Sequence, residues 1–182
     1  MSVSPELIYV EGAFACATAA AVTDLKSRRI PNWLTGSSLC LGLCLHLLLG
    51  GVRDAGLAFL AGLAAGGVFF LLFAAGGMGA GDVKLIAAVC SLGGMHAMPN
   101  ILLSTVLLGA VAAVLTALAK GRLHEMYLNL GLLLTHHQVH GLETHPQLNV
   151  RNHSLLRLPY AVPVAAGCLA TLLVTLHGGL NL

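Results

Sequence analysis

The stretch from Leu85 to Ala119, LIAAVCSLGGMHAMPNILLSTVLLGAVAAVLTALA, contains no Asp, Glu, Lys or Arg. A transmembrane helix needs about 20 apolar residues, so this stretch is too long for one ordinary span and long enough for two. Gly, Pro and Asn cluster as turn residues in its middle, from Gly93 to Asn100. We expect the chain to break there, after a short span and before a second one.

The whole chain has the same apolar character. Charged residues make up 9% and apolar residues 57% of its 182 residues, whereas soluble domains carry about a quarter charged residues. This composition excludes an intrinsically disordered chain and a disulfide-rich secreted scaffold. A net charge of +2, without a basic run that contains aromatic residues, excludes a nucleic-acid binder. The sequence therefore predicts an integral membrane protein that lies in a lipid bilayer.

The apolar runs predict helices. Only helices or closed barrels satisfy all backbone groups in lipid, and these runs lack the alternation of barrel strands. We expect a single all-α domain, residues 1–182, that forms a bundle of about six transmembrane helices. The expected spans are residues 7–23, 33–50, 55–75, 84–98, 100–119 and 158–176.

Lys and Arg residues predict the orientation of this bundle. In the six-span arrangement all of them except Arg53 fall on one side, which the positive-inside rule makes cytoplasmic. Both termini are then expected to face outward. Residues 120–157 are expected to form a cytoplasmic or interfacial segment with a short apolar helix at 126–135. The residues on the cytoplasmic side are Lys26, Arg28, Arg29, Lys84, Lys120, Arg122, Arg151 and Arg157.

No metal or cofactor is expected. The chain has five cysteines but no CxxC pair, so neither a zinc site nor a reactive dithiol is indicated. His136 and His140 have i, i+4 spacing, with His137 and Glu143 nearby, which is a spacing that suits a metal. A solvated cytoplasmic loop explains the same residues, and we favour that interpretation.

Two acidic residues, Asp24 and Asp82, stand at the cytoplasmic ends of long apolar runs, where a charge is costly. An interfacial carboxylate paired with Lys26 or Arg28 would explain Asp24 alone. Glycines crowd the turn before Asp82, so an extended peptide can approach this backbone closely. These glycines are Gly76, Gly77, Gly79 and Gly81.

Two such acids on one membrane face suggest an aspartic dyad. Two carboxylates close together cannot both ionise easily, so one keeps a proton and the other stays charged. The charged one can take a proton from water while the protonated one donates to a substrate carbonyl. The chain has no HExxH zinc motif and no GxSxG nucleophile motif that would indicate a different hydrolase.

Three motifs carry a resemblance to a known family. Residues 79–85, GAGDVKL, resemble the GxGDxKL signature of type IV prepilin peptidases, which are membrane aspartic proteases of the GxGD group. Asp24, followed by RIPN at residues 29–32, is similar to the first catalytic motif of that family. Residues 158–163, LPYAVP, resemble the opening of its last helix. GxGD alone is a weak signal, but three motifs in the order of the family are specific.

The resemblance implies an activity and a site. A type IV prepilin peptidase removes the short basic leader of a prepilin at the cytoplasmic face, just after a glycine, in the bacterial inner membrane. Its partner here would be a prepilin, with its leader peptide and apolar pilin helix, and Asp24 and Asp82 would be catalytic. The residues expected to bind substrate or to shape the loops are Gly79, Gly81, Lys84, Arg29, Pro31 and Asn32.

The chain departs from the longer members of the family. Those members carry a cytoplasmic domain with paired cysteines for zinc, so the amino-methylation activity that accompanies it is not expected here. The compact form resembles the peptidases of Flp (tight-adherence) pili, and archaeal preflagellin peptidases share its core motifs. The alternatives are an intramembrane protease of the presenilin or signal-peptide-peptidase type, and a small proton- or cation-coupled transporter that uses Asp24 and Asp82.

Overall fold

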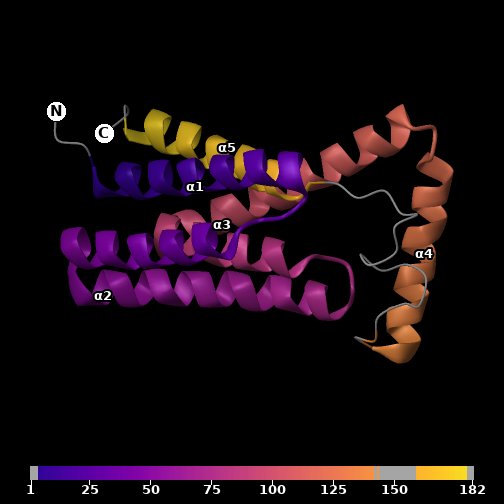
Figure 1. Ribbon diagram of the computed structural model, residues 1–182, viewed down its shortest axis with the longest axis horizontal. Helices are drawn as coiled ribbons and strands as arrows, with labels where there is room; N and C mark the ends of the chain where they lie inside the picture. Colours follow the sequence, from indigo (N-terminus) through magenta and orange to yellow (C-terminus); the bar gives the residue numbers. More distant parts are fainter. Residues whose placement is uncertain (1–3, 142, 144–158, 180–182) are drawn as a thin grey trace.

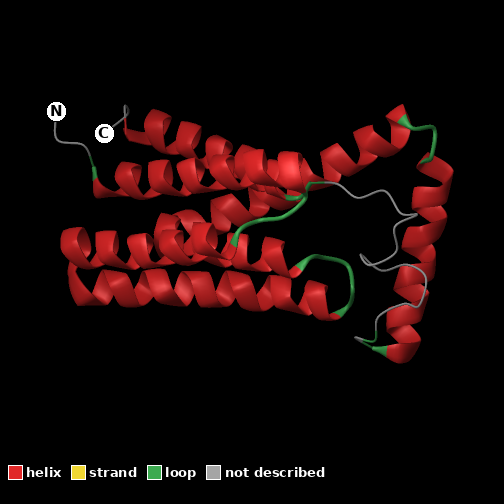
Figure 2. Ribbon diagram, viewed as in Figure 1, coloured by secondary structure: helices red, strands yellow, loops and turns green. Residues whose placement is uncertain are grey.

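A computed structural model describes residues 4–141, 143 and 159–179 of the chain. Within these residues every regular element is a helix, as Figure 2 shows. The helices are α1 (Pro5–Ser27), α2 (Asn32–Ala74), α3 (Ala80–Ala119), α4 (Leu123–His140) and α5 (Ala161–Gly179) (Figure 1). α1, α2, α3 and α5 are long and apolar enough to cross a membrane. The predicted all-α class is confirmed for the part of the chain that the structure describes.

Helix α2 is broken near its middle into two halves. Gly51 has φ 78° and ψ −174°, a backbone conformation that residues with a Cβ rarely adopt. The chain reverses there, and the two halves run side by side in Figure 1. The break falls next to the predicted end of a span at residue 50. The expected linker at residues 51–54 was too long, because helix resumes directly after Gly51.

Helix α3 is broken in the same way at Gly94, which has φ 75° and ψ 179°. This position lies in the predicted turn at 93–100, but the rest of that turn was wrong. Met95 to Asn100 are helical, so the predicted boundary between spans 84–98 and 100–119 is misplaced. One glycine with positive φ is enough to redirect the chain. Pro99 then lies in the second turn of the new half, where it cannot donate a backbone hydrogen bond to the Met95 carbonyl.

Helix α1 is longer than the predicted span 7–23. It continues to Ser27, so Asp24 lies in its last turn and not in a polar linker. Arg28 ends the helix in the left-handed conformation, φ 54°, and its N–H donates to the Asp24 carbonyl at 2.8 Å. A short linker, residues 28–31, then leads to α2, and Pro31 stands where a new helix readily begins.

Helix α3 is central and contacts α1, α2, α4 and α5. Its closest approaches use glycine. A Cβ on Gly62 of α2 would lie 2.8 Å from the Ala87 carbonyl oxygen, and a Cβ on Gly167 of α5 would lie 2.8 Å from the Thr105 nitrogen. Small residues that let helix backbones meet are typical of packing in membranes. Gly62 therefore acts as a packing residue between α2 and α3.

The flanks of the bundle expose large apolar side chains, which suits contact with lipid chains better than contact with water. Small side chains of α1 and larger ones of α3 fill the interior. Exposed examples on α2 and α3 are Leu48, Val52, Leu63, Phe70, Leu103, Leu107 and Leu115. Buried examples are Ala13, Ala17, Ala20, Leu85, Ile86 and Val89.

Helix α4 lies across the end of the bundle at which α1 ends and α5 begins (Figure 1). It is longer than the predicted helix 126–135 and includes His136, so the interpretation of this histidine as part of a loop was wrong. The hydropathy of α4 does not qualify it as a span. The remainder of the expected cytoplasmic segment, from residue 144 to residue 157, lies outside the described residues.

Candidate active site

Asp24 is a buried acid at the end of the bundle crossed by α4. It occupies the last turn of α1, and only 8% of its surface is exposed. Its carboxylate interacts with the backbone N–H of Ala161, the first residue of α5, and with the charge of Arg28. A helix N-terminus favours a negative charge, because its N–H groups are unpaired and its dipole is positive. Within the described chain Asp24 forms no ion pair with Lys26 or Arg28.

Asp82 lies in the first turn of α3, beside the glycine-rich turn. Its Oδ2 accepts a hydrogen bond from the Gly79 N–H at 3.3 Å. An acid in the first helical turn often caps the helix in this way, because the first N–H groups have no partner within the helix. The carboxylate is half-buried, so one oxygen is held by the cap while water can still reach the group.

The two acids come together with the start of α5. Asp24 and Asp82 are close enough to interact electrostatically. Tyr160, directly before α5, is half-buried, and its ring lies 6.3 Å from the ring of Phe69 between centroids. Burial raises the pKa of the Tyr160 phenol, and the negative charge of Asp82 raises it further. The carboxyl end of α1, the amino end of α3 and the amino end of α5 therefore meet in one place.

Two of the residues predicted to shape the loops contact one another. The Lys84 ammonium donates to Asn32 Oδ1 at 3.0 Å, so the start of α2 is tied to the first turn of α3. A Cβ on Gly81 would lie 3.5 Å from Ile30 Cβ, which is ordinary contact, so the turn packs against the 28–31 linker without requiring glycine there. Arg29 is exposed in the same linker, and Pro31 is half-buried beside it.

The glycine-rich turn needs glycine mainly for its backbone. Gly76 has φ 79°, a conformation that favours glycine. A Cβ on Gly79 would lie 3.0 Å from Asp82 Oδ2, so this position bears directly on the carboxylate.

The described residues do not gather three His, Cys, Asp or Glu side chains in a metal-binding arrangement. The side chains of His137 and His140 are not among those described. His136 Nε2 lies 3.1 Å from the Glu143 carbonyl oxygen. All five cysteines are free thiols.

Comparison with known proteins matches the part of the chain that contains both Asp24 and Asp82. The sequence profile of the type IV leader peptidase family matches residues 12–114, which is more than half of the chain. The chain belongs to the type IV leader peptidase family. The family that the three motifs predicted is therefore confirmed.

Among curated proteins the chain is similar to the prepilin leader peptidase/N-methyltransferase of Neisseria gonorrhoeae. The two are 36% identical over 105 residues, which cover 54% of this chain and 37% of the relative. This chain thus aligns with little more than a third of that protein. Comparison with solved structures gives no significant match.

In this member of the type IV leader peptidase family, Asp24 and Asp82 both lie within the matched residues, whereas Tyr160 lies beyond them. Sequence reasoning quoted Tyr160 in a motif but assigned it no place in the site. It also passed over His46, whose signal is a histidine within the apolar run 33–50. The structure joins His46 and Asp54 at the other end of the bundle.

Proposed function

We propose that this protein is a membrane-embedded aspartic endopeptidase that removes the basic leader of type IV prepilins, and that Asp24 and Asp82 form its catalytic pair. The observation that carries the proposal is the meeting of these two acids at one end of an apolar helix bundle. Membership of the type IV leader peptidase family supports the substrate class. Within that class we propose Flp-like prepilins as the substrates, because the motifs around Asp24 and Asp82 resemble those of the peptidases of Flp pili.

The surroundings of Asp24 and Asp82 support different protonation states for the two acids. Burial disfavours the ionised form of Asp24, and the Ala161 N–H at the positive N-terminus of α5, together with the charge of Arg28, offsets part of that cost. Two neighbouring carboxylates resist carrying two charges, so the pair tends to hold one proton. We propose that Asp24 is the ionised partner and that Asp82 carries the proton. Asp82 retains access to water and to a peptide that approaches along the turn at residues 76–79.

The reaction then proceeds in two steps, each with two proton transfers. Asp24 takes a proton from water as the water oxygen bonds to the scissile carbonyl carbon, and Asp82 gives its proton to the carbonyl oxygen. In the second step the carbon–nitrogen bond breaks. The proton on Asp24 passes to the leaving amine, and the hydroxyl proton of the intermediate returns to Asp82. The pair ends in its starting state.

The placement of the site in the membrane is part of the proposal. We propose that each half of α2 and of α3 crosses the bilayer, which together with α1 and α5 gives six crossings with both termini outside. The site end of the bundle then faces the cytoplasm, in agreement with the Lys and Arg distribution. The first half of α3, residues 80–93, rises only about 21 Å, less than the roughly 30 Å of a hydrocarbon core. Asp82 is therefore drawn toward the membrane, where the apolar pilin helix lies.

Removal of either carboxylate tests the pair. Asp24→Asn and Asp82→Asn should each lower prepilin cleavage by roughly 10²–10⁴-fold or more, because each performs a different proton transfer in one step. The double variant should be no worse than the slower single variant, since groups that act as a unit are strongly non-additive. Glu11→Gln, which changes an exposed acid on α1, is the matched control and should cleave normally.

The assay uses the purified full chain with an Flp-like prepilin and with a prepilin of another class, and follows the shortened product. Melting temperatures in the same detergent show that the Asn variants are folded. A folded Asp24→Asn protein that cleaves at the wild-type rate would refute the catalytic pair. Cleavage of the other prepilin alone would refute the Flp-like assignment and leave the pair intact.

A further inference from the structure

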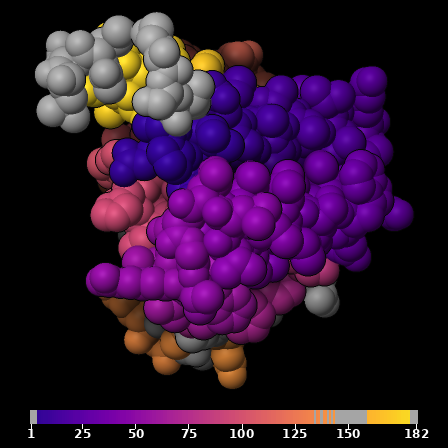
Figure 3. Space-filling model, turned by 90° about the vertical axis from the view of Figure 1, so that its left-hand side faces the viewer, coloured from indigo at the N-terminus to yellow at the C-terminus, as the bar shows by residue number. Residues whose placement is uncertain are grey.

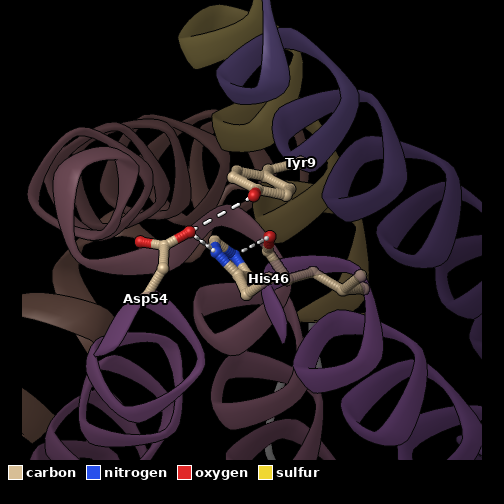
Figure 4. Close-up of polar contacts among 4 residues, drawn as sticks. Tyr9, His46 and Asp54 are labelled. Atoms are coloured by element: carbon tan, nitrogen blue, oxygen red, sulfur yellow. Dashed lines mark hydrogen bonds and ion pairs between the residues drawn. The ribbon is translucent and has the colours of Figure 1, made fainter. Parts of the chain in front are cut away.

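A buried histidine lies in the polar cluster that Figure 4 shows. The cluster lies near the breaks in α2 and α3, at the end of the bundle opposite α4 (Figure 1). His46 belongs to the first half of α2 and is 2% exposed. Its Nδ1 lies 2.8 Å from Asp54 Oδ2, and its Nε2 lies 3.1 Å from the Leu92 carbonyl oxygen. The Tyr9 hydroxyl donates to the same Asp54 oxygen at 3.2 Å. The Tyr9 ring stacks on the imidazole with centroids 3.7 Å apart.

The Leu92 carbonyl is available because α3 is broken. In a continuous helix this carbonyl would accept the N–H of His96, four residues later. Gly94, with φ 75°, turns the chain away before that bond can form, so Leu92 ends a half-helix with an unsatisfied carbonyl. Basic side chains commonly cap such carboxyl ends, since the helix dipole is negative there. His46 caps this end from another helix.

The two nitrogens of His46 both face hydrogen-bond acceptors. A neutral imidazole carries one N–H and one lone pair, so beside an ionised Asp54 it can donate either to Asp54 or to the Leu92 carbonyl, but not to both. The doubly protonated ring satisfies both. Asp54 is then the counter-ion, and its Oδ2 accepts from both His46 and Tyr9. A buried cation with a paired carboxylate avoids the cost of an isolated charge.

We propose that His46 is held as an imidazolium and forms a proton-dependent latch that joins α1, both halves of α2 and the broken end of α3. The latch comprises Tyr9, His46, Asp54 and the Leu92 carbonyl. It ties three helices at the end opposite the candidate active site. The latch does not depend on the proposed peptidase activity.

The latch needs its proton to hold all three helices. If His46 loses one proton, a lone pair faces either the carbonyl or the carboxylate, and the packing at this end weakens as the pH rises. If Asp54 gains a proton in acid, the imidazolium loses its counter-ion. The groups that face His46 are the Tyr9 phenol from α1, the Asp54 carboxylate from α2, and backbone at Leu92 and Gly94 from α3.

Protons reach the latch through Asp54. The side chain of Asp54 is 31% exposed, whereas that of His46 is 3% exposed. Figure 3 faces this end of the molecule, and α1 and α2 cover most of it. Further titratable side chains at this end are exposed, namely Glu6, Glu11, Arg53 and His96.

Nitrogen NMR of the full chain in detergent, labelled in its histidines, tests the charge state directly. At neutral pH the His46 ring should show a proton on both nitrogens. His46→Gln removes its signals and so assigns them. Tyr9→Phe, which keeps the stacked ring and removes one donor to Asp54, shifts the same signals and assigns them if His46→Gln does not fold. A bare ring nitrogen on His46 in the folded protein would overturn the proposal.

Thermal unfolding against pH tests the latch. The melting temperature of the wild type should fall as the pH is raised, because loss of the ring proton leaves one of the two acceptors without a donor. That of His46→Gln should start roughly 10 °C lower and be nearly flat, because the cross-link is already lost. His96→Gln, an exposed histidine on α3, is the matched control and should follow the wild type. Equal pH profiles for the wild type and His46→Gln would overturn the latch, whatever the cleavage activity.

Discussion

Replacing Gly94 with alanine should destabilise the protein more than the same change at Gly51. The two glycines have nearly the same backbone conformation, with φ 75° and ψ 179° at Gly94 and φ 78° and ψ −174° at Gly51. A residue with a Cβ pays about 1–3 kcal/mol to adopt this conformation. The surroundings differ, because a Cβ on Gly51 meets nothing within 4 Å, whereas one on Gly94 would lie 2.6 Å from His46 Cε1.

The difference between the two variants therefore isolates the contact with the His46 ring. Gly51→Ala should lower the free energy of unfolding by the backbone strain alone, about 1–3 kcal/mol. Gly94→Ala adds the overpacking of a buried ring, about 1–3 kcal/mol more. At 2–4 °C for each kcal/mol in a protein of this size, the two melting temperatures should differ by about 2–12 °C.

The assay is thermal unfolding of both variants in the same detergent, followed by circular dichroism. A third comparison places Gly94→Ala in a His46→Ala background, where the ring is gone. The cost of the alanine should then fall to the cost measured at Gly51, since the coupling between neighbours is removed. Equal melting temperatures for the two single glycine variants would refute the reasoning. An undiminished cost in the His46→Ala background would refute it as well.

Two further predictions concern the candidate site. Gly79→Ala should lower kcat for prepilin cleavage with little change in melting temperature, because its Cβ would lie 3.0 Å from Asp82 Oδ2. Gly81→Ala makes only ordinary contact and should retain more activity. A cleavage assay in which Gly81→Ala is the less active variant would contradict this prediction. Lys84→Met should lower kcat while costing about 0.5–1.5 kcal/mol of stability, because it removes an exposed hydrogen bond to Asn32 Oδ1. Lys84→Arg should restore part of the rate. Full activity of Lys84→Met would show that this bond does not position the site.

The sequence predicted the class and the main breaks of the fold. Apolar runs near 20 residues identify membrane helices because lipid demands the same property of every residue in a span. The break beside residue 50 followed from the end of such a run. The break in α3 was placed too broadly, since Gly93 to Asn100 all have turn propensity while the turn itself uses Gly94 alone. Propensity marks where a chain can bend, and packing selects the residue at which it does.

The sequence by itself also determined the family and the two candidate acids, Asp24 and Asp82, because each stands in a short local motif whose spacing is readable along the chain. Only the tertiary structure decided their partners. The Ala161 N–H that faces Asp24 comes from 137 positions later in the chain, and the Leu92 carbonyl that faces His46 from 46 positions later. The physical reason is that hydropathy and motifs act over a few residues, whereas these contacts depend on how helices pack and on where α3 breaks.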